Sequence, residues 1–260
     1  MARMKRLVLL LAAMPLFAQS PERAVGIGNF IHVVADLDKT MAFYGDVLGL
    51  ERTGAPGPRA FSPNDLVEKL YDARGSQSRV AVFKIPGSPI GLEFVEFKGI
   101  PQTPFRPDPA GTGAMKLRLV IPNAAAVMSK LNRAAGGTVQ DPDGFNVEIS
   151  AGGGLPAELT AVAGTAGKPH EFFRDLMEFH VSGSASAGHS APAIHDPGVG
   201  LIRVLVRDVD ASLAALKSAG ATVVSANGEA AVAGTRHYAI LRDPDGFFFQ
   251  LFPAPPAAAK

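Results

Sequence analysis

The first pattern of apolar and polar positions along the chain is a short apolar run followed by a helical stripe. Residues 29–34 (NFIHVV) are largely β-branched and aromatic, which predicts a strand. Asp36 follows, and its carboxylate can accept hydrogen bonds from the free amides that begin a helix. Apolar residues then recur at spacings of four, three and four, at Leu37, Met41, Tyr44 and Leu48. Gly49 can adopt the left-handed turn that ends such a helix, so a strand and an amphipathic helix are predicted.

Two further extended runs complete this first unit. Residues 79–85 (RVAVFKI) and residues 91–97 (GLEFVEF) are separated by a Pro-Gly-Ser-Pro turn. The predicted order is therefore a strand, a helix and a meander of strands.

The same order of elements recurs later in the chain. Extended runs at residues 116–121 (KLRLVI) and 201–206 (LIRVLV) are followed by the capping residues Asn123 and Asp208 and by helical stripes. Each of these two copies then reaches the turn Asp-Pro-Asp-Gly before a last strand, FNVEIS or FFFQLF. A weaker copy at residues 158–179 aligns without gaps on the first unit. The chain therefore contains four related modules.

The motifs of these modules resemble a known superfamily. The stretch HVVADLDKTMAFYGDVLGLE, with the later DPDGFNVEI and DPDGFFFQL, is similar to the vicinal-oxygen-chelate superfamily of glyoxalase I, extradiol dioxygenases and bleomycin-resistance proteins. The resemblance covers most of residues 27–253 and is most specific in the first module. It implies an α+β fold in which tandem βαβββ modules pair into two curved mixed-sheet half-barrels.

The resemblance also implies a division of the chain into domains. Modules one and two form a first domain at residues 25–150, and modules three and four form a second at residues 155–253, with a hinge near residues 152–154. Few residues separate the third module's helix from the fourth module's first strand, which leaves open whether the second domain is complete. Residues 254–260 are expected to be a disordered tail.

In metal-dependent members of the superfamily, His or Gln on the first strand and Glu on the last strand of each module face inward. Counting seven places back from the capping Asp36 gives Asn29, and the last strand of that module gives Glu93. The first and last strands of the second module give Lys116 and Glu148. The second domain gives Glu158, Leu201 and Gln250. A lysine ammonium and a leucine side chain have no lone pair to donate. The cofactor is therefore unknown: a divalent ion (Zn, Ni, Mn or Fe) is disfavoured by Asn29, Lys116 and Leu201.

A metal-free site is the alternative. Lys116 between Glu93 and Glu148 can balance their charges, and Lys116 with Glu148 is then the candidate catalytic acid/base pair. Glu93, Glu148 and His32 are weaker candidates for metal ligands. His32 lies three residues after Asn29 and points to the opposite face of a regular strand unless a bulge intervenes. We expect His32 to be a hydrogen-bonded packing residue.

The N-terminus has the pattern of a secretory signal peptide. Arg3, Lys5 and Arg6 precede the apolar run 7–17, and the small residue Ala18 follows, so the predicted signal is residues 1–18. The apolar run is shorter than the ~20 residues of a membrane-spanning helix. An uncleaved anchor or a buried core helix is the alternative. We expect an exported protein, periplasmic or secreted, without membrane contact after removal of the signal.

Composition narrows the partners. Removal of the signal takes away three of the 25 basic residues and leaves 22 basic and 24 acidic residues, a net charge near −2. This charge does not indicate a basic surface for nucleic acid. The chain has no cysteine, which excludes disulfides, thiolate nucleophiles and cysteine-based zinc sites. The expected partner is a small molecule, and a monomer or a homodimer fits the number of modules.

Two function classes follow from the resemblance. The first is an enzyme of the glyoxalase or dioxygenase type, a lyase, isomerase or dioxygenase that binds a small organic substrate. The second is a non-catalytic binding or sequestering protein of the bleomycin-resistance type, without a metal. In either class the ligand-binding candidates are Asn29, Glu93, Ile31, Val95 and Phe248.

Overall fold

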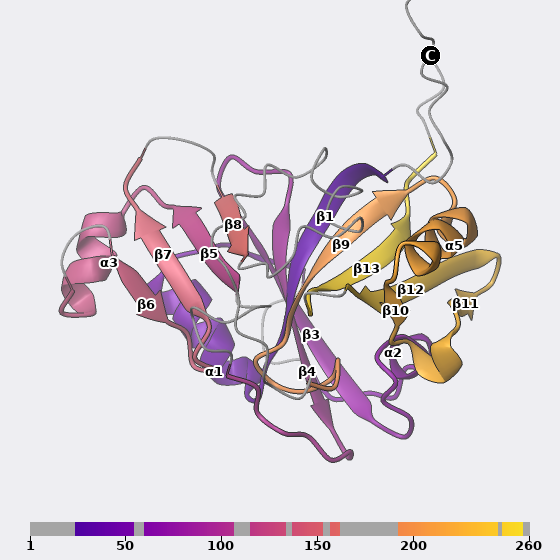
Figure 1. The fold of residues 1–260 in the computed structure, drawn as a ribbon. Helices are drawn as coiled ribbons and strands as arrows, with labels where there is room; N and C mark the ends of the chain where they lie inside the picture. The colour runs from indigo at the N-terminus through magenta and orange to yellow at the C-terminus, as the bar shows by residue number, and fades with distance from the viewer. Residues whose placement is uncertain are drawn as a thin grey trace, which may run out of the picture.

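The computed structural model describes residues 24–54, 60–106, 115–133, 137–152, 157–161, 192–243 and 246–256 (Figure 1). The predicted signal peptide and the helix of the weak third module lie outside these residues. In the part of the chain that is described, no helix is both long enough and apolar enough to cross a membrane.

The first module has the predicted order of strand, helix and meander. Its elements are β1 (Ala24–Val33), α1 (Leu37–Met41), the π-helical turn η1 (Ala42–Val47), β2 (Arg52–Thr53), α2 (Asp65–Leu70), β3 (Gln77–Lys84) and β4 (Gly91–Lys98). Asp36 caps α1, because its carboxylate accepts hydrogen bonds from the amides of Asp38 and Lys39, both at 3.1 Å. Gly49 ends the helix at a φ of 77°. The short helix α2 is an element that the sequence pattern does not predict.

The later modules keep the same order. The second and the start of the third contain β5 (Met115–Val120), α3 (Ala124–Lys130), β6 (Thr138–Gln140), β7 (Asn146–Ser150) and β8 (Ala157–Ala161). The fourth contains β9 (Gly200–Val206), α5 (Val209–Ser218), β10 (Thr222–Val223), the 3-10 turn η2 (Ala226–Gly228), β11 (Ala231–Ala233), β12 (Arg236–Arg242) and β13 (Phe248–Pro253). Asp208 caps α5 through the amide of Ala211 at 3.0 Å, whereas the side chain of Asn123 makes no capping bond to α3.

The strands form one large and one small mixed sheet. The nine-stranded main sheet has the order β10-β12-β13-β9-β1-β4-β3-β2, with β11 paired to β12, and the small sheet has the order β6-β7-β5-β8. Both sheets contain parallel and antiparallel pairs. The prediction of an α+β fold with curved mixed sheets is confirmed (Figure 1).

The pairing of the modules differs from the expected division into residues 25–150 and 155–253. β1 pairs antiparallel with β9, with Ile31 opposite Leu201, so the first module shares its sheet with the fourth. The second module pairs through β5 with β8, the first strand of the third module. The expectation that modules pair in chain order was wrong, because β1 of the first module is hydrogen-bonded to β9 of the fourth module.

The main sheet has an apolar cluster on each face. On one face, called the α1 face, Phe30 and Phe94 pack with Leu37 of α1 and with Phe145 of the second module. On the other, called the α2 face, side chains from β1, β4, β9 and β13 pack under the end of α2, among them Ile31, Val95, Leu201, Phe248 and Leu70. Alternate residues of β1 therefore belong to different clusters.

Replacing Asp36 with alanine tests the capped start of α1. We expect the free energy of unfolding at pH 7 to fall by about 1 kcal/mol, the usual cost of removing such a cap. The hydrogen bond from the Lys39 amide is the largest cause that lowers the pKa of Asp36. A carboxylate with a lowered pKa stabilises above its unfolded-state pKa, and this stabilisation is lost as the pH falls through the folded-state pKa.

The measurement is urea denaturation of both proteins at pH 7 and at about pH 3, below the ordinary pKa of aspartic acid. The difference in unfolding free energy between the wild-type protein and Asp36→Ala should be present at pH 7 and smaller at the lower pH. Asn123→Ala is the matched control, because Asn123 precedes a helix without capping it. An equal loss at both pH values would contradict the electrostatic explanation.

Candidate functional site

Four polar side chains meet on the α2 face of the main sheet, and we call them the polar quartet: Asn29, Glu93, Arg203 and Gln250. They come from β1, β4, β9 and β13, which are neighbours in the sheet in the order β13-β9-β1-β4. Arg203 and Gln250 are directly paired residues of β9 and β13. The quartet exists only because the first and fourth modules share a sheet.

Hydrogen bonds join all four members of the quartet. Arg203 donates from Nε to Oε1 of Gln250 at 2.6 Å and from Nη2 to Oε1 of Glu93 at 3.0 Å. Asn29 donates from Nδ2 to the other Glu93 oxygen, Oε2, at 2.9 Å. The Oδ1 atom of Asn29 accepts from the backbone amide of Gly91 at 3.1 Å. Both oxygens of the Glu93 carboxylate are thus engaged, and the amide of Asn29 is fixed in orientation.

The surroundings hold the Arg203 side chain in place. The side chains of Arg203 and Glu93 are only 17% and 14% exposed. The guanidinium carbon of Arg203 lies 4.8 Å from the centre of the Phe252 ring, a cation–π contact. A Cβ atom at Gly28 would lie 2.8 Å from Cδ of Arg203, so the glycine makes room for the arginine. Arg203 is therefore an organised part of the sheet.

Tyr71, at the end of α2, belongs to the same surroundings. Its burial is the main cause that raises the pKa of its phenol, the charge of Glu93 adds to the effect, and Arg203 opposes it. The hydroxyl of Tyr71 therefore stays protonated and neutral beside the quartet.

The quartet does not fit a divalent metal ion. Asn29, Glu93 and Gln250, three of the inward positions expected from the resemblance, belong to the quartet, but Arg203, and not Leu201, is the polar residue of β9. Leu201 lies two residues earlier on the same face and is 0% exposed in the apolar cluster. A guanidinium has no lone pair to give and repels a cation. Its two hydrogen bonds also occupy oxygens that would have to coordinate the ion.

The other predicted pair lies elsewhere. Lys116 and Glu148 are on β5 and β7 of the small sheet, where Lys116 Nζ is 2.7 Å from Oε2 of Glu148. Their side chains are 40% and 31% exposed, and Arg118 Nε lies 3.7 Å from Oε1 of Glu148. The prediction that Lys116 lies between Glu93 and Glu148 was wrong, because Glu93 belongs to the main sheet and is bridged there by Arg203.

The residues expected to line a cavity are packed. Ile31, Val95 and Phe248 are 0%, 2% and 3% exposed and lie in the apolar cluster of the α2 face. Leu70 and Tyr71 belong to the same cluster. Phe248 also borders a small void of about 20 Å³. The helix α2, which the sequence pattern did not reveal, contacts β11, β12 and η2 and adds Leu70 to this cluster.

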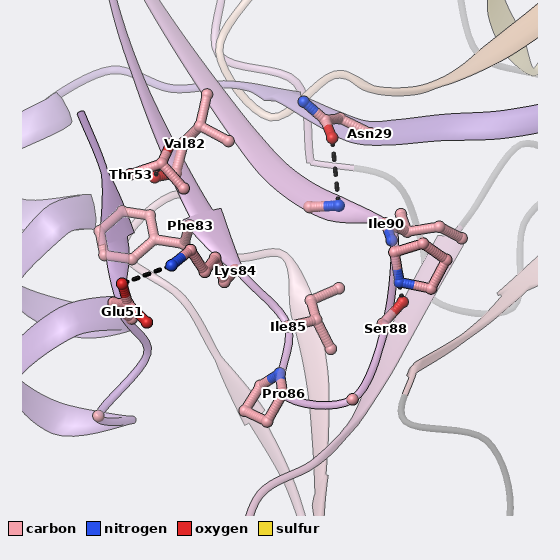
Figure 2. A pocket seen from close by; sticks show the side chains of 14 residues that line it. Asn29, Glu51, Thr53, Val82, Phe83, Lys84, Ile85, Pro86, Ser88 and Ile90 are labelled. Atoms are coloured by element: carbon pink, nitrogen blue, oxygen red, sulfur yellow. Dashed lines mark hydrogen bonds and ion pairs between the residues drawn. The ribbon is translucent and has the colours of Figure 1, made fainter. Parts of the chain in front are cut away.

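A larger pocket lies beside Asn29. Its volume is about 490 Å³, and it lies between the turn that joins β3 to β4, the end of β3, and the segment 49–53 (Figure 2). Most of its lining side chains are apolar: Val82, Phe83, Ile85, Pro86, Pro89 and Ile90. The polar ones are Asn29, Glu51, Thr53, Lys84 and Ser88. Lys84 Nζ lies 2.6 Å from Oε1 of Glu51, so this lysine and this acid neutralise one another.

His32 lies on the α1 face, opposite Asn29, as strand alternation predicts. Its Nδ1 is 3.2 Å from the carbonyl oxygen of Val199, and its Nε2 is 3.3 Å from Oδ2 of Asp141. Burial lowers the pKa of His32, but Asp141, Asp143 and the carbonyl of Val199 together outweigh this effect and raise it. His32 does not take part in the quartet.

Sequence reasoning missed Arg203, Tyr71 and the pocket. An arginine in the middle of the apolar run LIRVLV was the available signal for Arg203, because a charged residue within a buried strand needs a partner. Nothing in the sequence pattern marks the pocket, which forms where the β3–β4 turn comes near Asn29.

Comparison with known proteins supports the resemblance. The profile of the Glyoxalase/Bleomycin resistance protein/Dioxygenase superfamily matches residues 150–251. Comparison with curated proteins gave no match. Glyoxalase I from Zea mays is 15% identical, with a TM-score of 0.53 over 89% of this chain and 92% of that chain. The cppA protein from Streptococcus pneumoniae is 11% identical, with a TM-score of 0.52 over 89% and 99%.

At these identities the solved structures show the likeness of the fold alone. The profile matches the third and fourth modules, although the first module carries the most specific of the motifs. The family predicted from those motifs is confirmed. Residues 150–251 thus match the model of the Glyoxalase/Bleomycin resistance protein/Dioxygenase superfamily, and the chain as described has a fold like that of glyoxalase I.

Proposed function

We propose that the protein binds a small organic molecule in the pocket beside Asn29, without a divalent metal on the α2 face. The observation that carries the proposal is the position of Arg203, whose guanidinium binds Glu93 and Gln250 together. A fixed cation thereby balances the Glu93 carboxylate. The quartet then serves to orient the amide of Asn29 at the edge of the pocket.

The size and lining of the pocket support a ligand with a mainly apolar body. Small-molecule pockets of about 300–1,000 Å³ are typically apolar with a few fixed polar groups. The pocket here, at about 490 Å³, has this composition. Asn29 is held by Glu93 and Gly91, so a ligand meets a polar group that needs no reorganisation.

Binding is favoured over catalysis by the ionisable groups around the pocket. The lysine and the acid that line it, Lys84 and Glu51, form an exposed ion pair, with side chains 57% and 69% exposed. The candidate acid/base pair, Lys116 and Glu148, lies in the other sheet and is itself an ion pair. A sequestering role of the bleomycin-resistance type fits better than a lyase, isomerase or dioxygenase reaction.

The proposed function includes export. The basic residues and the apolar run of residues 1–18 support transfer to the periplasm or the exterior. A protein that keeps these residues and stays in the cytoplasm would contradict this part of the proposal, and mass measurement of the fractionated protein would show it.

Filling the pocket tests its role. We expect Val82→Phe to weaken binding of the apolar anionic dye 1-anilinonaphthalene-8-sulfonate by at least about tenfold, which corresponds to about 1.4 kcal/mol. Val82 lines the pocket and is partly buried, so a larger ring takes up ligand volume. Fluorescence titration measures the affinity. The control is Val232→Phe, the same change at a side chain that is 47% exposed outside the pocket. Equal affinities for both variants would place the dye elsewhere.

A double-mutant cycle tests the Arg203–Glu93 pair. Arg203→Met leaves the Glu93 carboxylate desolvated without its cation, and we expect unfolding free energy to fall by about 2–3 kcal/mol. Adding Glu93→Gln removes the stranded charge, so the double variant should be more stable than the sum of the two single losses predicts. Urea denaturation at neutral pH gives the four values. Strictly additive losses would show that the two groups do not interact.

A further inference from the structure

A second group of ionisable side chains lies on the α1 face of β1 and plays no part in the proposed function. His32 lies on β1, and Asp141 and Asp143 lie in the Asp-Pro-Asp-Gly turn of the second module. One potential ligand atom of each lies within 4.8 Å of the other two. His32 is 0% exposed, Asp141 is 5% exposed, and Oδ2 of Asp143 is buried. We call these three residues the buried triad.

Each triad member has one side-chain atom that is hydrogen-bonded to the backbone. Nδ1 of His32 lies 3.2 Å from the carbonyl oxygen of Val199, and a carbonyl only accepts, so this nitrogen carries a proton. Oδ1 of Asp143 accepts from the amide of Ala35 at 3.0 Å. Oδ1 of Asp141 accepts from the amide of Asp143 at 3.0 Å. These backbone bonds leave unused one nitrogen and two oxygens: Nε2 of His32, Oδ2 of Asp141 and Oδ2 of Asp143.

Two of these atoms have no hydrogen bond although they are buried: Nε2 of His32 and Oδ2 of Asp143. Nε2 approaches Oδ2 of Asp141 to 3.3 Å, but without the geometry of a hydrogen bond. A proton on Nε2 could be donated to Asp141 but would still leave Oδ2 of Asp143 without a partner. Buried polar atoms without partners are rare in native proteins and ask for an explanation such as a bound ion.

We propose that the buried triad binds one divalent first-row metal ion, and that Zn²⁺ is the ion it fits best. Zn²⁺ accepts histidine nitrogen together with aspartate oxygen, and three protein ligands suffice in many zinc sites. A neutral imidazole and two carboxylates exactly balance a charge of +2, which relieves the cost of two buried anions.

The bonds around the triad match those that usually orient metal ligands. A coordinating histidine almost always donates its other ring N–H to a carbonyl or a carboxylate, as His32 does to Val199. Ligating carboxylates are in turn hydrogen-bonded, and the hydroxyl of Tyr44 donates to Oδ2 of Asp141 at 3.2 Å. The ion would join β1 to the turn of the second module and so strengthen the contact between the two sheets.

The experiment is zinc binding by the full chain after treatment with a chelator, followed by calorimetric titration with Zn²⁺ and by element analysis. We expect one Zn²⁺ per chain and a melting temperature that rises with Zn²⁺ concentration. Asp143→Asn, which keeps the shape of the side chain, should weaken zinc binding by about a hundredfold or more, since removal of outer partners alone costs about 10–100-fold. Tyr44→Phe, which removes only an outer partner, should weaken it less.

Two controls separate this site from other zinc binding. His237→Gln removes a histidine whose Nδ1 lies 2.7 Å from Asp210 in an exposed pair, and zinc binding should not change. Glu93→Gln alters the polar quartet and should also leave it unchanged.

Zinc uptake that is absent in the folded wild-type protein, or unchanged in folded Asp143→Asn, would overturn the proposal. Zinc binding that is lost in Glu93→Gln and kept in Asp143→Asn would overturn the proposal as well. This result would also indicate a metal site on the α2 face and so contradict the proposed function. If the dye does not bind but Zn²⁺ does, the proposed function is contradicted and the proposal of a zinc site at the buried triad stands.

Discussion

The hydrogen bonds between β1 and β9 are the constraint on which the rest of the structure depends. They place residues 24–33 beside residues 200–206 and make one sheet from the first and fourth modules. Glu93 and Arg203 come from β4 and β9, on either side of β1, and they meet only within this shared sheet. The second module is left to form its own sheet and packs its Phe145 against Phe30, with ring centres 5.3 Å apart.

The two faces of β1 have separate electrostatic roles. On the α2 face, the negative charge of Glu93 is balanced by an arginine from a neighbouring strand. On the α1 face, His32 meets the two aspartates of a turn. Because successive residues of a strand point to opposite faces, Asn29 and His32 lie only three residues apart on β1 and are separated by the sheet itself. The α2 face thus keeps its carboxylate compensated, as burial demands, whereas on the α1 face a buried oxygen of Asp143 has no hydrogen-bond partner.

Local patterns predicted the elements well and their partners poorly. Asp36, Gly49 and the Asp-Pro-Asp-Gly turns act over a few residues, so the sequence reveals the helix ends and the order of each module. Sheet neighbours depend on contacts between distant segments, and nothing local distinguishes pairing in chain order from the pairing observed. Arg203 was missed because counting back from Asp208 ended at Leu201, whereas the polar side chain of β9 lies two residues later on the same face.

The place of β1 in the sheet order also has a consequence for how the chain reaches its native state. β1 is made first, but its partner β9 is made only after about three quarters of the chain has been synthesised. Until then β1 has a free edge on one side, and free edges are where unfolded chains associate. Sheets dominated by such distant pairings form slowly. The β1 edge therefore stays unpaired for longer during synthesis than the corresponding edge in a protein whose modules pair in chain order.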